Sequence, residues 1–249
     1  SKEHPPDRLQ SVPQVWDQLF SGHLSGSCRN RAIILRISLI SRSSSDISSS
    51  RNGTIAQIAL ASIGIEDFID FRWKRWRRHG LVFPAFTDKD AVLFPEQFGG
   101  KYALLHRVDP HIWITFSSHL RCPWPRKKHR ILAGATSGMM WDGIKIGGGA
   151  QPIKTRYGWL LITHSVDYAR VYRLGIMLLD LKDPSKLLYR SPNPVLEPAT
   201  EMEMGDKKSW VSNVVFTCGA VPKGEPKGIL SEDDELILYY GAADSFVCA

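Results

Sequence analysis

The sequence contains no run of about 18 uncharged apolar residues, which is roughly the minimum for a helix that crosses a bilayer. Residues 1–6 are polar or proline and lack the apolar segment at the centre of a secretory signal. These absences exclude a membrane-spanning helix and predict that the protein has no membrane partner. We therefore expect a soluble protein.

Cysteine is also scarce, with only Cys28, Cys122, Cys218 and Cys248 in 249 residues. Four cysteines in a chain of this length do not form a disulfide scaffold, and no two of them have the spacing of a zinc-binding pair. The sequence therefore predicts free thiols, no structural metal and a reducing compartment. We expect the protein in the cytoplasm.

Long amphipathic helical patterns are missing as well. From residue 54 onward, short apolar runs alternate with Gly, Pro, Asp and Asn, which is typical of strands joined in hairpins. The runs lie at residues 55–61, 102–105, 112–116, 158–164, 175–181, 211–216 and 236–240. This pattern predicts an all-β sandwich, barrel or propeller, with no helix longer than about three turns after residue 80.

The first 53 residues differ from the rest in composition. Residues 1–30 are rich in Pro, Ser and Gly without a sustained period, and residues 41–50 are a serine-rich stretch that cannot pack a core. Between them, residues 32–40 predict a strand. We divide the chain into a degenerate or partly disordered N-terminal segment, 1–53, and a β domain, 54–249.

The formal net charge of +7 is concentrated in the first third of the chain. Residues 1–80 carry 12 Lys and Arg against 7 Asp and Glu, and much of the excess lies at residues 72–78, where basic residues alternate with Trp73 and Trp76. Such a cluster suits phosphate contacts and base stacking. It equally suits a solvated edge whose tryptophans point inward. Because no nucleic-acid-binding signature accompanies it, we favour the edge and predict no nucleic-acid partner.

Nine short sequence motifs are more specific than the strand and turn residues of an ordinary β protein. In chain order they are DKDAVLFPE (88–96), GKYALLHR (100–107), WDGIKIGGG (141–149), PIKT (152–155), GWLLITH (158–164), YRLG (172–175), LLDL (178–181), NVVF (213–216) and YYGAAD (239–244). Together, over residues 54–249, they resemble glycoside hydrolase family 130, the β-mannoside phosphorylases and their relatives.

The resemblance implies an all-β, five-bladed β-propeller with a sugar site at the mouth of its central channel. It also implies an inverting phosphorylase of the β-1,4-mannosyl-saccharide type, in which phosphate attacks a terminal β-mannosyl unit and releases α-mannose 1-phosphate. The expected partners are a β-mannoside oligosaccharide and inorganic phosphate, the latter as co-substrate, with no further cofactor.

Three basic residues match the phosphate-binding positions of the family. Lys145 and His164 lie 19 residues apart on what are expected to be consecutive inner strands, and Arg107 follows His106 on another. A dianionic nucleophile needs converging cations, and an arginine binds phosphate through two parallel hydrogen bonds. Glycines 147–149 would let backbone approach a ligand closely.

Three other residues are candidates for the sugar. Asp244, at the end of YYGAAD, matches the family aspartate that binds mannosyl hydroxyls, although a hairpin-turn aspartate is an equal alternative. Asp90 is placed to reach the cleft, as is Asp88, and turn chemistry explains both equally well. Tyr240 offers a ring for stacking on a sugar face, as do Trp141 and Trp159, of which Trp159 is better explained by core packing.

One family element is missing. The general acid is an aspartate in a Glu-Asp-Pro-Arg string, which the 249 residues do not contain. The nearest candidate by position has Arg29 and Asn30 in its place, and an arginine does not donate a proton at neutral pH. Asp67 and Asp46 would replace the acid only if folding brought one of them into the cleft. No catalytic residue is therefore assigned.

Chain length also departs from the family pattern. At about 40–50 residues a blade, residues 54–249 provide roughly four blades, which predicts a truncated or degenerate member with an incomplete first blade. Open sheet edges favour pairing with another chain, so a homo-oligomer is compatible with the sequence.

Three functions therefore stay open. The first is a β-mannoside phosphorylase with weak or absent catalysis, and the second is a non-catalytic propeller that binds a sugar or phosphosugar. The third is a β-mannoside hydrolase of the same family, which uses water and has no need of the cations Arg107, Lys145 and His164.

Overall fold

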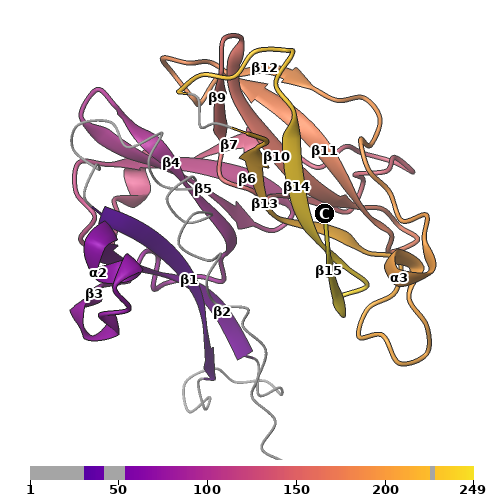
Figure 1. The fold of residues 1–249 in the computed structure, drawn as a ribbon, viewed down its shortest axis with the longest axis horizontal. Coiled ribbons are helices and arrows are strands. Elements are labelled where there is room, and N and C mark those ends of the chain that lie inside the picture. The colour runs from indigo at the N-terminus through magenta and orange to yellow at the C-terminus, as the bar shows by residue number, and fades with distance from the viewer. Residues whose placement is uncertain (1–30, 42–53, 225–227) are drawn as a thin grey trace, which may run out of the picture.

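The computed structural model describes the backbone of residues 31–41, 54–224 and 228–249 (Figure 1). Within these ranges it describes side chains from residue 56 onward, except those of Lys128 and Cys218. Strands dominate the described residues, so the all-β expectation is confirmed. The α-helices among them are α2 (Ile65–Ile69) and α3 (Glu201–Met204), and single 3-10 turns form η1 (Trp73–Arg75) and η2 (Arg126–Lys128). No helix in this part of the chain has the length and apolar character to cross a membrane.

The first of four antiparallel sheets has the order β1-β2-β3. It consists of β1 (Arg31–Ser41), β2 (Thr54–Gly64) and β3 (Arg77–Leu81). The predicted strand at 32–40 is therefore present as β1, and it pairs with β2 from Arg31 opposite Gly64 to Ser41 opposite Thr54. The serine-rich stretch after Ser41, like Arg29, Asn30 and Asp46, lies outside the described residues.

The other three sheets follow in chain order, each built from neighbouring strands. The second sheet contains β4 (Lys89–Phe98), β5 (Lys101–Val108), β6 (His111–Ser117) and β7 (Arg130–Ala133). The third contains β8 (Lys145–Gly148), β9 (Ile153–Thr155), β10 (Gly158–Val166), β11 (Tyr172–Leu179) and β12 (Leu187–Arg190). The fourth contains β13 (Val215–Pro222), β14 (Leu236–Ala242) and β15 (Phe246–Cys248).

Apolar layers between consecutive sheets hold the structure together. Along β5, Leu104 packs with Ile58 of the first sheet, whereas the next residue, Leu105, packs with Ile146 and Leu161 of the third. Successive side chains of a strand point to opposite faces, so the second sheet is buried on both sides. The same principle joins the third sheet to the fourth through Ile162 and Val215. The sheets therefore pack face to face in chain order.

One predicted strand is shorter than expected. The apolar run 211–216 becomes a strand only from Val215, because Asn213 adopts a left-handed backbone with φ 57. A strand cannot continue through that conformation. Instead the Asn213 N–H donates to the carbonyl of Met204, which ties this segment to α3.

The basic segment 72–78 is a solvated edge, but Trp73 does not point inward. Its side chain is 48% exposed and packs edge-on against Phe68 and Phe71, with ring centroids 5.5 and 5.6 Å apart. Arg72 pairs with Asp67 and Asp70 of α2 and its flank. Asp67 and Asp70 therefore neutralise part of the positive charge of this segment.

Replacement of Leu105 by alanine tests the layer between the second and third sheets. Leu105 is fully buried, so Leu105→Ala should lower the free energy of unfolding by about 2–5 kcal/mol through lost burial and a residual cavity. Urea denaturation measures this loss. Leu188→Ala is the matched control, because Leu188 is 53% exposed and should change the free energy by less than about 0.5 kcal/mol. Equal losses in both variants would contradict the proposed packing.

Candidate functional site

Arg107 and His164 meet at the seam between the second and third sheets. Arg107 lies on β5 and His164 on β10, and Arg107 Nη1 is 3.0 Å from His164 Nε2. The Arg107 side chain is only 5% exposed, and His164 is fully buried. Two residues that are 57 positions apart in sequence are thus in direct contact.

Lys145 lies on the same face of the third sheet as His164. In the antiparallel ladder Lys145 is opposite Val166, and His164 is opposite Gly147. Because residues two apart on a strand share a face, the side chains of Lys145, Val166 and His164 emerge on one side. The Lys145 ammonium lies 5.3 Å from the centre of the Tyr172 ring.

Asp90 is placed between the two basic residues at the seam. Its Oδ2 lies 2.6 Å from Arg107 Nη1 and 3.1 Å from His164 Nε2, and its side chain is 9% exposed. Burial opposes the charge of this carboxyl, but the hydrogen bond with His164 and the charges of His164, Arg107 and Lys89 outweigh burial and hold its pKa below the ordinary value. Asp90 was predicted as a sugar-binding residue; here its partners are protein cations.

Asp109 is a member of the site that sequence reasoning missed. It follows β5, and its Oδ1 lies 2.7 Å from Arg107 Nε, while the side chain is 68% exposed. The guanidinium of Arg107 therefore contacts one buried and one exposed carboxylate. The only sequence signal was an aspartate two residues after the arginine, in the Asp-Pro turn between β5 and β6.

Gly147 creates the space that the buried cluster occupies. A Cβ at residue 147 would overlap both the Asp90 carboxylate and the His164 ring. Gly149 does the same for the Thr217 side chain of the fourth sheet. The glycine run was expected to let backbone approach a ligand, and the described contacts at these two positions are with side chains of the protein.

The inner side of His164 faces the fourth sheet. The Phe216 ring lies 4.2 Å from the His164 ring, centre to centre. Among the described residues, His164 Nδ1 and Thr217 Oγ1 are buried without a hydrogen-bond partner. Buried polar atoms are normally paired, and Asp90 Oδ2 and Arg107 Nε in the same cluster also lack a partner with hydrogen-bond geometry.

The two other predicted sugar-binding residues lie on the fourth sheet. Asp244 is exposed in the turn between β14 and β15, where its φ is 48. Tyr240 is on β14, and its hydroxyl donates to Glu203 at 2.7 Å. This contact and burial raise the pKa of Tyr240 to about 12. The structure does not join either residue to the Arg107 cluster through any contact in its described part.

The candidate aromatic residues divide as the sequence suggested. Trp159 is fully buried and packs edge-on against Phe94 and Phe98, so its expected role in the core is confirmed. Trp141 is partly exposed, and its indole N–H donates to the Pro192 carbonyl at 2.9 Å.

Asp67, a candidate replacement for the general acid, does not reach this site. It lies on α2 and forms an ion pair with Arg72 at 2.6 Å. Figure 1 shows α2 beside the first sheet, well separated from β10, which carries His164. The described residues therefore supply no acid from this segment.

A second buried polar cluster lies on the opposite face of β5. Asp88 Oδ1 is 2.8 Å from His106 Nδ1, and His106 Nε2 is hydrogen-bonded to His129 Nε2. Burial raises the pKa of Asp88 to about 8 and lowers the pKa of His106 to about 3. Both shifts favour the uncharged forms of Asp88 and His106.

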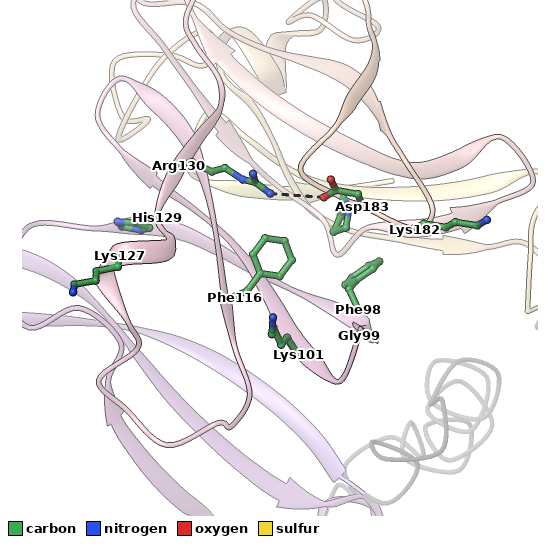
Figure 2. A pocket seen from close by; sticks show the side chains of 10 residues that line it. Phe98, Gly99, Lys101, Phe116, Lys127, His129, Arg130, Lys182 and Asp183 are labelled. Carbon is green, nitrogen blue, oxygen red and sulfur yellow. Dashed lines mark ion pairs between the residues drawn. The ribbon is translucent and has the colours of Figure 1, made fainter.

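A basic hollow of about 520 Å³ lies apart from the Arg107 cluster and shares His129 with the second cluster (Figure 2). Figure 2 shows the rings of Phe98 and Phe116 between Lys101 and the Arg130–Asp183 ion pair. His129 also lines it, but none of the predicted phosphate- or sugar-binding residues does.

Comparison with known proteins assigns the chain to a family. The profile of glycoside hydrolase family 130, described as beta-1,4-mannooligosaccharide phosphorylase, matches residues 58–249. A 1,2-beta-oligomannan phosphorylase of Thermoanaerobacter sp. is 43% identical over 173 residues, which are 69% of this chain and 52% of that protein. A beta-1,4-mannooligosaccharide phosphorylase of Ruminococcus albus is 30% identical over 75% of this chain and 53% of the relative.

Solved structures agree with this assignment. The β-1,2-mannobiose phosphorylase from Listeria innocua, in complex with β-1,2-mannobiose, aligns with a TM-score of 0.63 and 35% identity over 78% of this chain and 50% of that chain. A glycosyl hydrolase from Bacteroides ovatus, at 18% identity and a TM-score of 0.62, shares the fold over 90% of this chain and 61% of its own.

The sheet architecture is all-β, and a solved structure of the family shares it over most of this chain. The chain belongs to glycoside hydrolase family 130, as its sequence strings predicted. It spans about half the length of the curated phosphorylases that it matches.

Substitution of Asp88 tests the neutral cluster through the pH dependence of stability. Because the folded pKa of about 8 lies above the ordinary value of 3.8, this carboxyl contributes stability that is complete below about pH 4 and is lost as the pH rises through about 8. Asp88→Asn has no proton to lose, and its amide still donates to His106.

Urea denaturation at about pH 5 and about pH 8 should therefore show a smaller fall in unfolding free energy for Asp88→Asn than for the wild type, by at most about 1.4 kcal/mol per pH unit. The control, Asp233→Asn, removes an exposed carboxyl and should keep the wild-type slope. Parallel curves for wild type and Asp88→Asn would show that Asp88 is ionised in the folded protein.

Proposed function

We propose that this protein binds the substrates of a β-mannoside phosphorylase, a β-mannoside and inorganic phosphate. Arg107, Lys145 and His164 would hold the phosphate. The contact between Arg107 and His164 at the seam carries the proposal, because it brings two phosphate-compatible side chains together in a buried place. Charge-assisted hydrogen bonds from such groups are the usual way to hold a phosphate. Lys145, on the same face of the third sheet, adds the third donor.

The preferred linkage is proposed to be β-1,2. Relatives named for β-1,2-mannosides or 1,2-β-oligomannan are 37–43% identical to this chain, whereas the relative named for β-1,4-mannooligosaccharides is 30% identical. This differs from the β-1,4 type implied by the sequence strings. The released product would be α-mannose 1-phosphate, as expected for inversion.

The architecture proposed for the complete site is a five-bladed propeller. Four consecutive sheets that pack face to face support it, as they would form successive blades. In that arrangement the inner strands of the second and third sheets would turn Arg107, Lys145 and His164 toward the central channel. Asp244 and Tyr240 remain proposed sugar contacts from the fourth sheet, and we expect a cytoplasmic protein that is able to form homo-oligomers.

The chemistry requires more than a phosphate site. A phosphate oxygen forms a bond to the anomeric carbon as the glycosidic C–O bond breaks, and the departing sugar oxygen must receive a proton. General acids contribute about 10²–10⁴-fold to such steps. The 249 residues lack the Glu-Asp-Pro-Arg string, so we propose that this polypeptide by itself binds phosphate and turns over weakly.

Two alternatives follow from the same features. The missing acid motif favours a non-catalytic protein that binds a sugar or phosphosugar, and the turnover measurement below separates it from the phosphorylase. A β-mannoside hydrolase is less favoured, because water needs no cationic site and Arg107, Lys145 and His164 are all present.

The phosphate site is tested by Lys145→Ala. Loss of a charged donor typically removes about 1.5–3 kcal/mol, so the dissociation constant for inorganic phosphate should rise by about tenfold or more. Isothermal titration calorimetry measures it, and the melting temperature should stay close to that of the wild type because Lys145 is partly exposed. The control Lys74→Ala changes an exposed lysine of η1. If both variants bind phosphate as the wild type does, Lys145 has no part in the site.

Catalysis is tested by incubating the chain with β-1,2-mannobiose and phosphate and measuring mannose 1-phosphate. We expect a turnover at least about 100-fold below the ordinary enzymatic value of about 10 per second. Incubation with β-1,4-mannobiose in parallel should give less product still. Turnover at the ordinary value would show that another residue of this chain supplies the proton.

A further inference from the structure

Arg107 forms ion pairs with two carboxylates, one buried and one exposed to solvent. Asp90 contacts Nη1 at 2.6 Å and is 9% exposed, whereas Asp109 contacts Nε at 2.7 Å and is 68% exposed. One partner is therefore locked in the interior and the other faces solvent. Two carboxylates on one guanidinium leave little positive charge for an incoming anion.

Asp90 fixes the geometry of the site. Its Oδ2 contacts both Arg107 Nη1 and His164 Nε2, so a single oxygen positions the guanidinium and the imidazole 3.0 Å apart. Gly147 leaves no spare room around it, because a Cβ there would overlap Asp90 and His164 together. Asp90 itself adopts a left-handed backbone with φ 50, which costs energy in a residue other than glycine.

Asp109 is the solvent-exposed partner of Arg107, and the guanidinium itself is almost fully buried. An exposed carboxylate keeps most of its hydration, so its ion pair contributes little stability and opens at small cost. A phosphate offers the same charge-assisted acceptor geometry to a guanidinium as a carboxylate does. Phosphate and Asp109 would therefore compete for the positive charge of the Arg107 guanidinium.

The charges around Arg107 determine how strongly a dianion is attracted. Arg107 and Lys145 carry two positive charges, and Asp90 and Asp109 carry two negative charges that face the same arginine. A dianion gains net attraction only when one carboxylate withdraws. Asp109 can turn into water, but Asp90 would have to leave a buried place beside Arg107 and His164.

We infer that Asp90 and Asp109 act in opposite directions on anion binding at Arg107. Asp90 is a positioning residue that holds Arg107 and His164 in register, and Asp109 is an exposed competitor that phosphate displaces. This inference rests on the proposed phosphate site, and it adds two residues that control that site.

The test compares Asp90→Asn and Asp109→Asn in the full chain by calorimetric titration with inorganic phosphate at fixed pH and ionic strength. Asp109→Asn should lower the dissociation constant by about three- to tenfold, because the competing charge is gone. Asp90→Asn should raise it by about tenfold or more, because Arg107 and His164 lose their common anchor. Asp183→Asn, which alters an exposed aspartate beside Arg130, is the matched control and should not change it.

A second measurement separates positioning from general stability. If Asp90 acts through His164, then Asp90→Asn introduced into a His164→Gln background should cause little further loss of phosphate binding. A purely structural role would give the same loss in both backgrounds and would overturn the inference for Asp90. Should Asp90→Asn fail to fold, Asp109→Asn still decides: tighter binding supports the inference, and unchanged or weaker binding overturns it.

The outcomes also distinguish this inference from the proposed function. Wild-type binding that Lys145→Ala weakens, together with aspartate variants that both match the wild type, would overturn the opposed roles and leave the phosphate site intact. A wild type that binds neither phosphate nor sulfate would overturn both proposals.

Discussion

The buried carboxylate of Asp90 is the constraint on which the seam between the second and third sheets depends. An arginine and a histidine cannot be packed side by side in an apolar interior without a counter-charge, because desolvation of the cation is too costly. Asp90 provides that charge to both residues through one oxygen. Gly147 then has to be a glycine, since any side chain would take the place of this oxygen.

The polar seam lies within an apolar layer that fixes its dimensions. Ile146 on β8 directly precedes Gly147, and Leu105 on β5 lies two residues before Arg107. Both apolar side chains are fully buried in the layer between the second and third sheets. Packing at native density leaves little freedom for either backbone. The Arg107–His164 distance is therefore a consequence of sheet packing as well as of the charge on Asp90.

Sequence reasoning recovered the parts of this protein that are encoded locally. The alternation of short apolar runs and turn residues predicted β2, β5, β6, β10, β11 and β14. It missed shorter strands, among them the edge strand β3, which is largely exposed and contains Arg77 and Arg78 in place of an apolar face. Arg107, Lys145 and His164 were identified from motif positions. Asp109 was not, and Gly147 was expected to face a ligand rather than Asp90 and His164. Which side chains meet across a seam depends on the packing of two sheets, which no local period reports.

Anion binding and proton donation have separate structural origins in this chain. In the described part of the chain, the side-chain partners of Arg107 and His164 include each other, Asp90, Asp109 and Phe216, which belong to the second to fourth sheets. The family's acid motif was expected upstream of these sheets, and the 249 residues do not include it. Because the cations are anchored by Asp90 and by the apolar layers around them, their geometry does not depend on the presence of an acid. The proposed phosphate site and the ability to cleave a glycosidic bond are therefore separate questions for this polypeptide.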